Sequence, residues 1–172
     1  MRSWLPLLLL FSLSGCADLL GGGPREPCPC VSILRDAAEV THFREGPGRE
    51  PRDMRLQGRL GEVASRCDID DGRVVARTSI EVLAERGPAA SEPAQGLAFF
   101  VALIDPSERI LAKEIFHTRF EFEADRPRSA VVEHIEQRFT LRAGEHMARY
   151  AILVGFQLTR EELDRNRRSR ER

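Results

Sequence analysis

The sequence predicts a mainly β protein, built as an antiparallel β-sandwich with a short C-terminal helix. Apolar and polar residues alternate with a period of two through most of the chain, and turn-forming Gly, Pro and Asp residues interrupt the alternation at short intervals. A helix-start signal near the C-terminus then places one helix after the last strand.

The first half of the domain is predicted to be strands joined by short turns. Apolar stretches at 31–34 and 39–43 precede a loop rich in Gly and Pro. Alternation starts at Met54, and the apolar set changes register past Gly61, which predicts a bulge or bend there. Asp70-Asp71-Gly72 predicts a tight hairpin turn, followed by a return strand at 74–84.

The second half continues the pattern. The run 97–104 is continuously apolar, which is typical of a central strand buried on both faces. Alternating apolar positions predict further strands at 110–122, 131–141 and 150–158. The chain therefore holds seven or eight strands, enough for two packed sheets or a barrel.

Tyr150 favours the sandwich. Ala148-Arg149-Tyr150-Ala151-Ile152 opens the last strand directly after a turn. This arrangement resembles the tyrosine corner of immunoglobulin-like and fibronectin-like sandwiches, in which the hydroxyl bonds back across the corner. The resemblance implies a sandwich of that kind. The alternative interpretation is a tyrosine that fills an ordinary strand position.

The C-terminal segment 159–172 is predicted to be a helix with a basic tail. Thr159 and Glu162 form a capping box, and Leu158 and Leu163 occupy the positions of a hydrophobic staple. The arginines that follow could touch anionic lipid or cell-wall polymer. The favoured interpretation is a solvated, fraying end, because acidic residues dilute the charge.

The N-terminal segment 1–15 has the pattern of a secretion signal. Arg2 supplies a positive start, and the apolar run that ends at Leu13 is too short to span a bilayer as a helix. Leu13-Ser14-Gly15-Cys16 resembles the lipobox of bacterial lipoproteins. The resemblance implies that the leader is removed and Cys16 is acylated. Ala17 directly after the cysteine favours the periplasmic face of the outer membrane over the inner membrane.

Composition and cysteine count limit what the mature domain can be. Residues 16–27 form a Gly- and Pro-rich tether, and residues 28–158 are long enough for one domain with a core. The formal net charge of −1 gives no indication of nucleic-acid binding, and Lys113 is the single lysine among 26 basic residues. An exported chain permits a disulfide, so we expect either Cys28 or Cys30 to pair with Cys67.

Several short segments also resemble a set of uncharacterised alphaproteobacterial lipoproteins. The segments are Leu34-Arg35-Asp36-Ala37-Ala38, Glu85-Arg86-Gly87-Pro88-Ala89-Ala90, Gly155-Phe156-Gln157-Leu158-Thr159 and Asn166-Arg167. In that set the first cysteine of the pair is the standard one. The resemblance therefore implies a Cys28–Cys67 bridge, with Cys30 as the alternative to Cys28, and brings no known activity.

The sequence offers no catalytic, cofactor or metal-binding motif. Asp68-Ile69-Asp70-Asp71-Gly72 departs from a calcium loop at Gly72, and its context is a hairpin. The four histidines lack the spacing of metal ligands, and no Gly-x-Ser-x-Gly nucleophile motif occurs. We therefore expect no metal, no cofactor and no enzyme activity.

Two functional hypotheses remain. The first is a non-catalytic, lipid-anchored envelope module that binds or assembles with a protein partner. The second is a small-ligand carrier or enzyme with its site in the end loops 44–53, 86–96 and 124–129. A protein partner predicts an exposed apolar patch or an open edge strand, whereas a ligand site predicts a closed apolar pocket with convergent polar groups.

Overall fold

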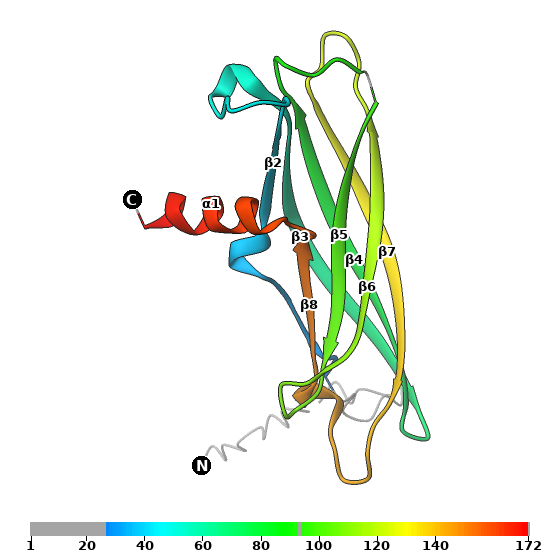
Figure 1. Cartoon of the computed structure of the whole chain (residues 1–172). Coiled ribbons are helices and arrows are strands. Elements are labelled where there is room, and N and C mark those ends of the chain that lie inside the picture. The colour runs from blue at the N-terminus through cyan, green and yellow to red at the C-terminus, as the bar shows by residue number, and fades with distance from the viewer. Residues whose placement is uncertain (1–26, 93, 172) are drawn as a thin grey trace, which may run out of the picture.

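The computed structural model describes residues 27–92 and 94–171, which form a β-sandwich with one C-terminal helix (Figure 1). One sheet has the strand order β1-β8-β5-β6 and the other has the order β2-β3-β4-β7. We call them the β5 sheet and the β4 sheet. The expected mainly β sandwich is confirmed. The leader, Cys16 and nearly all of the tether lie outside the described residues.

The strands follow the alternation closely. They are β1 (Cys30–Ile33), β2 (Glu39–Phe43), β3 (Met54–Asp70), β4 (Arg73–Arg86), β5 (Ala94–Ile104), β6 (Ile110–Glu121), β7 (Arg128–Thr140) and β8 (Ala151–Phe156). Short 3-10 turns η1 (Arg35–Ala37), η2 (Pro51–Asp53) and η3 (Met147–Arg149) lie between them, and α1 (Arg160–Arg170) follows β8.

The pairing is antiparallel except at one edge. β1 pairs in parallel with β8, so the edge of the β5 sheet joins the first and the last strand of the domain. β3 and β4 form the long hairpin, with Asp71 and Gly72 both at positive φ in its turn. The register shifts between Leu60 and Val63, which confirms the bulge expected at Gly61.

The core lies between the inner faces of the two sheets. Leu56 and Ile80 from the β4 sheet meet Leu97, Phe99 and Phe156 from the β5 sheet, all at most 2% exposed. Gly58 is required in this layer, since a Cβ there would lie 2.4 Å from Leu97 Cδ1. The run 97–104 does form an inner strand. Its outer-face residues, however, are only half-buried at Phe100 and Ile104.

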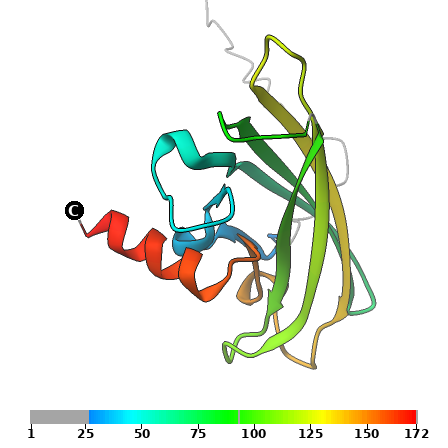
Figure 2. The same cartoon turned by 45° about the horizontal axis from the view of Figure 1, so that its top comes forward.

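The C-terminal helix differs from the expected fraying tail. Thr159 Oγ1 and Glu162 form the predicted capping box. Asn166 Nδ2 then donates to the backbone oxygens of Asp36 and Glu39, while Arg167 and Arg170 pair with the Asp36 carboxylate. The helix is therefore fastened to η1 and the start of β2, and its axis projects sideways from the sandwich (Figure 2).

Candidate functional site

The clearest candidate for a binding surface is the first half of β6. This strand forms the edge of its sheet and pairs with β5 alone. Ile110, Leu111 and Ile115 are 63%, 45% and 50% exposed, which places on one short segment three of the six exposed large hydrophobic side chains among the described residues. An edge strand offers free backbone donors and acceptors, so exposed apolar residues on it mark a pairing surface.

The sandwich is open beside this segment. In the second half of β6, a hydrogen bond of 2.7 Å from Thr118 Oγ1 to Glu133 Oε1 joins this strand to β7. Four residues earlier on β6, Glu114 has the same inward parity and yet is exposed. Four residues later on β7, the buried Gln137 has an Oε1 atom without a hydrogen-bond partner. The seam between the sheets is thus closed at Thr118 and open at Glu114.

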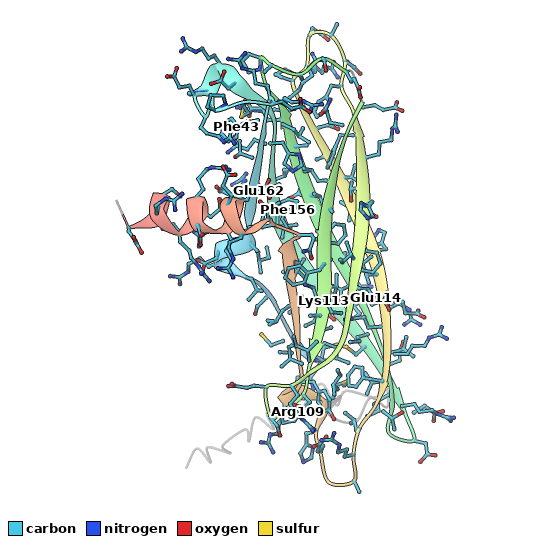
Figure 3. All side chains as sticks on the ribbon, in the orientation of Figure 1. Phe43, Arg109, Lys113, Glu114, Phe156 and Glu162 are labelled. Carbon is cyan, nitrogen blue, oxygen red and sulfur yellow. A yellow bond between two sulfur atoms is a disulfide. The ribbon has the colours of Figure 1, made fainter. Side chains whose placement is uncertain are left out.

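Lys113 and Glu114 project from opposite faces of β6 (Figure 3). Lys113 Nζ lies 4.2 Å from the centre of the Phe100 ring on the outer face of the sheet. Within the described part of the chain neither Lys113 nor Glu114 forms an ion pair. This strand therefore holds two adjacent, opposite charges that are available to a partner.

An apolar groove borders this segment on the outer face. It has a volume of about 480 Å³ and separates β5 and β6 from η1 and α1. Phe100 and Lys113 contribute to one side, and Leu34, Ala37 and Leu163 contribute to the other. Gly155 lets η1 sit this close, because a Cβ there would lie 2.9 Å from Ala37 Cβ. The groove therefore continues the apolar surface of β6 along the outer face of the sheet, from β6 toward β5 and β8.

The outer face of the β4 sheet is different in character. Arg77 pairs with Asp68 and Glu136, and Arg138 also pairs with Glu136. The hydrogen bond to Asp68 is the main cause that raises the pKa of Arg77 above its ordinary value. The centre of this face is therefore a network of paired charges, unlike the exposed apolar segment of β6.

The end loops form a polar cleft. Loops 44–53, 86–96 and 124–129 lie at the same end of the sandwich (Figure 1). A cleft of about 510 Å³ lies between the first two of these loops, β2 and the start of α1. Within this cleft, the guanidinium carbons of Arg49 and Arg165 lie over the Phe43 ring, at 5.6 and 5.1 Å from its centre.

The charges in this cleft satisfy one another. Glu161 Oε1 accepts from both Arg49 and Arg165, and these hydrogen bonds hold the pKa of Glu161 below its ordinary value. His42 Nε2 lies 3.7 Å from Glu162. Asp53 fixes the loop 44–53, because it accepts hydrogen bonds from the Glu50 backbone and from Arg44. These bonds lower the pKa of Asp53. The cleft is open and charged, unlike the closed apolar pocket that a ligand carrier predicts.

A buried carboxylate organises the turn before β6. Asp105 has a side chain only 1% exposed and accepts from Arg109 Nε and Nη2 at 2.9 and 2.6 Å. It also accepts from the backbone N–H groups of Ser107 and Arg109. The Arg109 side chain is the main cause of the lowered pKa of Asp105. This turn fixes the position at which the open edge begins.

Tyr150 lies immediately before β8 and is 3% exposed. Its hydroxyl donates to the Glu145 carboxylate in the preceding turn, and its ring contacts Phe139 at a centroid distance of 5.0 Å. Burial, followed by this hydrogen bond, raises the pKa of Tyr150. The partner described here is a side chain, and the tyrosine corner stays a prediction.

The cysteines pair as the family resemblance implied. Cys28 is joined to Cys67, with the Cα atoms 5.5 Å apart, and Cys30 is an exposed free thiol. The predicted disulfide is confirmed with Cys28 and not with Cys30. Among residues 27–92 and 94–171, no group of three or more His, Cys, Asp or Glu side chains is placed to hold a metal ion.

Comparison of the chain with protein-family models, with curated proteins and with solved structures gives no match. No helix in the described ranges is long and apolar enough to cross a membrane.

Sequence reasoning missed the open edge. The alternation at 110–122 correctly predicted a strand, but its inward positions are buried only in the second half, and all of 110–115 are exposed. The local signal was present as three large apolar residues on both parities, at 110, 111 and 115. A strand with one buried face does not need apolar residues on both sides.

Proposed function

We propose that this protein is a non-catalytic, lipid-anchored module of the bacterial cell envelope that binds a protein partner through the open edge of β6. The observation that carries the proposal is the exposure of Ile110, Leu111 and Ile115 on an edge strand. Exposed apolar surface of this kind in a soluble domain marks an interaction site.

The position of the tether supports the proposal. The register aligns Cys30 with Ala151, Ala151 with Ile104, and Ile104 with Ile110. The first residue of β1 and the first residue of β6 are therefore at the same level of the sheet. An anchor at Cys16, preceding β1, holds the open edge at the membrane-proximal end. The lipobox favours the periplasmic face of the outer membrane as the place of attachment.

Site-specific photo-crosslinking in cells tests the binding surface. A photoreactive amino acid at Leu111 should give a discrete adduct, because its side chain lies on the open edge. The matched control is the same amino acid at Arg66, an exposed position on the charged face of the other sheet. Equal adducts from both positions, or none from Leu111, would refute the proposed surface.

Membrane attachment is tested separately. Cys16→Ser should move the protein from the membrane fraction to the soluble fraction, since acylation of this thiol supplies the anchor. Continued membrane attachment of the variant with an unchanged leader cleavage would contradict the lipoprotein assignment.

A further inference from the structure

We infer that the partner adds a β-strand to the first half of β6, and that this strand carries an acidic and a basic residue side by side; this inference rests on the proposed function. Edge-strand addition uses main-chain hydrogen bonds for affinity and alternate side chains for specificity. The exposed segment from Ile110 to Ile115 is six residues long, which is an ordinary length for a paired strand.

The charges of β6 define the pattern of the partner. Residues that lie opposite each other in paired strands point to the same face of the sheet. An acidic residue opposite Lys113 would therefore lie on the outer face and pair with the free Nζ above Phe100. The neighbouring partner residue would lie opposite Glu114, at the open seam between β6 and β7.

The open seam between β6 and β7 holds hydrogen-bond acceptors that lack a donor. Glu114 is an exposed carboxylate, and Gln137 Oε1 at the same level of β7 is buried without a donor. A buried acceptor without a partner destabilises the fold. An arginine or lysine on the incoming strand would supply donors to both groups. Apolar residues on either side of the charged pair would cover Leu111 and Ile115.

A second copy of this chain does not meet these requirements, although β6 itself carries adjacent opposite charges. In a closed dimer formed by antiparallel pairing of β6 with its own copy, the two-fold axis is perpendicular to the sheet. The outer faces of both copies then lie on the same side. Lys113 can face only outer-face residues of the other copy, and Glu114 is an inner-face residue. The favourable charge pair is excluded, so the partner is a different protein.

Two peptides of identical composition test the inference. The matched peptide Thr-Val-Arg-Glu-Thr-Val-Thr places arginine and glutamate opposite Glu114 and Lys113 in an antiparallel strand. The control Thr-Val-Glu-Arg-Thr-Val-Thr exchanges them. Binding to the whole chain carrying Cys16→Ser is measured by fluorescence polarisation. The matched peptide should bind about fivefold or more tightly than the control, since cross-strand charge pairs contribute up to about 1 kcal/mol each and like charges oppose pairing.

Two variants make the result specific. Lys113→Glu should reduce or invert the preference for the matched peptide. N-methylation of alternate peptide bonds should abolish binding, because it removes main-chain donors. Amide hydrogen exchange should show protection at 110–115 only when the matched peptide is present.

Equal affinity for both peptides, no binding of either, tolerance of N-methylation, or self-association of the chain through β6 would overturn the inference. If Leu111 still crosslinks in cells while the peptides show no charge preference, strand addition is wrong and the proposed binding surface stands. If Leu111 gives no crosslink, the proposed function itself fails.

Discussion

At the scale of single residues, Asp105 determines where the open edge begins. Its buried carboxylate accepts four hydrogen bonds within the β5–β6 turn, two of them from the Arg109 guanidinium. Arg142 Nη1 lies 3.6 Å from the same carboxylate and brings the β7–β8 turn alongside. One acidic side chain thus ties together two loops at the same end of the sandwich.

Asp105→Asn should lower the melting temperature at pH 7. The folded-state pKa of Asp105 lies below its ordinary value of 3.8, so the ionised form stabilises the fold. This contribution is fully present above about pH 4 and is lost as the pH falls through the folded-state pKa. The difference in melting temperature between wild type and variant should therefore shrink below pH 4.

The matched control for this prediction is Asp125→Asn, at an exposed position in the opposite loop. It should leave the melting temperature unchanged at every pH. Thermal unfolding followed by circular dichroism measures both variants. A constant difference for Asp105→Asn between pH 3 and pH 7 would contradict the proposed ionic role.

At the scale of elements, α1 is held by η1 rather than by a broad apolar face. Asn166 makes two hydrogen bonds to backbone oxygens, 2.9 Å to Asp36 and 2.8 Å to Glu39. Asn166→Ala should lower the free energy of unfolding by about 1–2 kcal/mol, because each such bond contributes roughly 1 kcal/mol. The matched control is Arg168→Ala, at an exposed helix position for which no partner is described. It should change the free energy of unfolding by less than about 0.5 kcal/mol.

Urea unfolding monitored by circular dichroism compares the two helix variants. Equal stabilities would show that Asn166 does not fasten the helix. The sequence predicted this helix correctly through its capping box at Thr159 and Glu162, since that signal is local. Its docking was not predictable, because Asn166 and Asp36 are 130 residues apart.

The strands illustrate the same limit. The period-two pattern predicted β3, β4 and the bulge near Gly61, since each depends on neighbouring residues alone. The division into two sheets depends on which strands pair, and β1 with β8 joins the two ends of the domain. The open edge of β6 depends on what does not pair with it, which local alternation does not encode.

At the scale of the whole molecule, the disulfide connects the start of the domain to the long hairpin. Cys67→Ser should lower the free energy of unfolding by about 4 kcal/mol on the loop-entropy model, because the bridge closes a loop with a sequence separation of 39. Cys30→Ser should have little effect, since Cys30 is exposed and unbridged. Chemical unfolding without reductant measures both variants, and a loss of equal size in each would contradict the assigned pairing.

The overall arrangement is a sandwich with two distinct faces. The β4 sheet presents paired charges to solvent, and the β5 sheet presents an apolar edge and groove. Sequence reasoning predicted the sandwich correctly, and it posed the choice between an open edge and a closed pocket; the anchor stays a prediction. The choice between edge and pocket depends on packing, and the exposure of β6 favours the edge.

One measurement tests the binding edge most directly. Ile115 on β6 and Val132 on β7 are both β-branched residues on edge strands, 50% and 53% exposed. The full chain carrying Ile115→Glu or Val132→Glu is purified from cells, and co-purified proteins are quantified by mass spectrometry. We predict that a specific partner recovered with wild type is retained by Val132→Glu and lost from Ile115→Glu, at equal melting temperatures. Equal recovery with both variants would contradict a binding surface on β6.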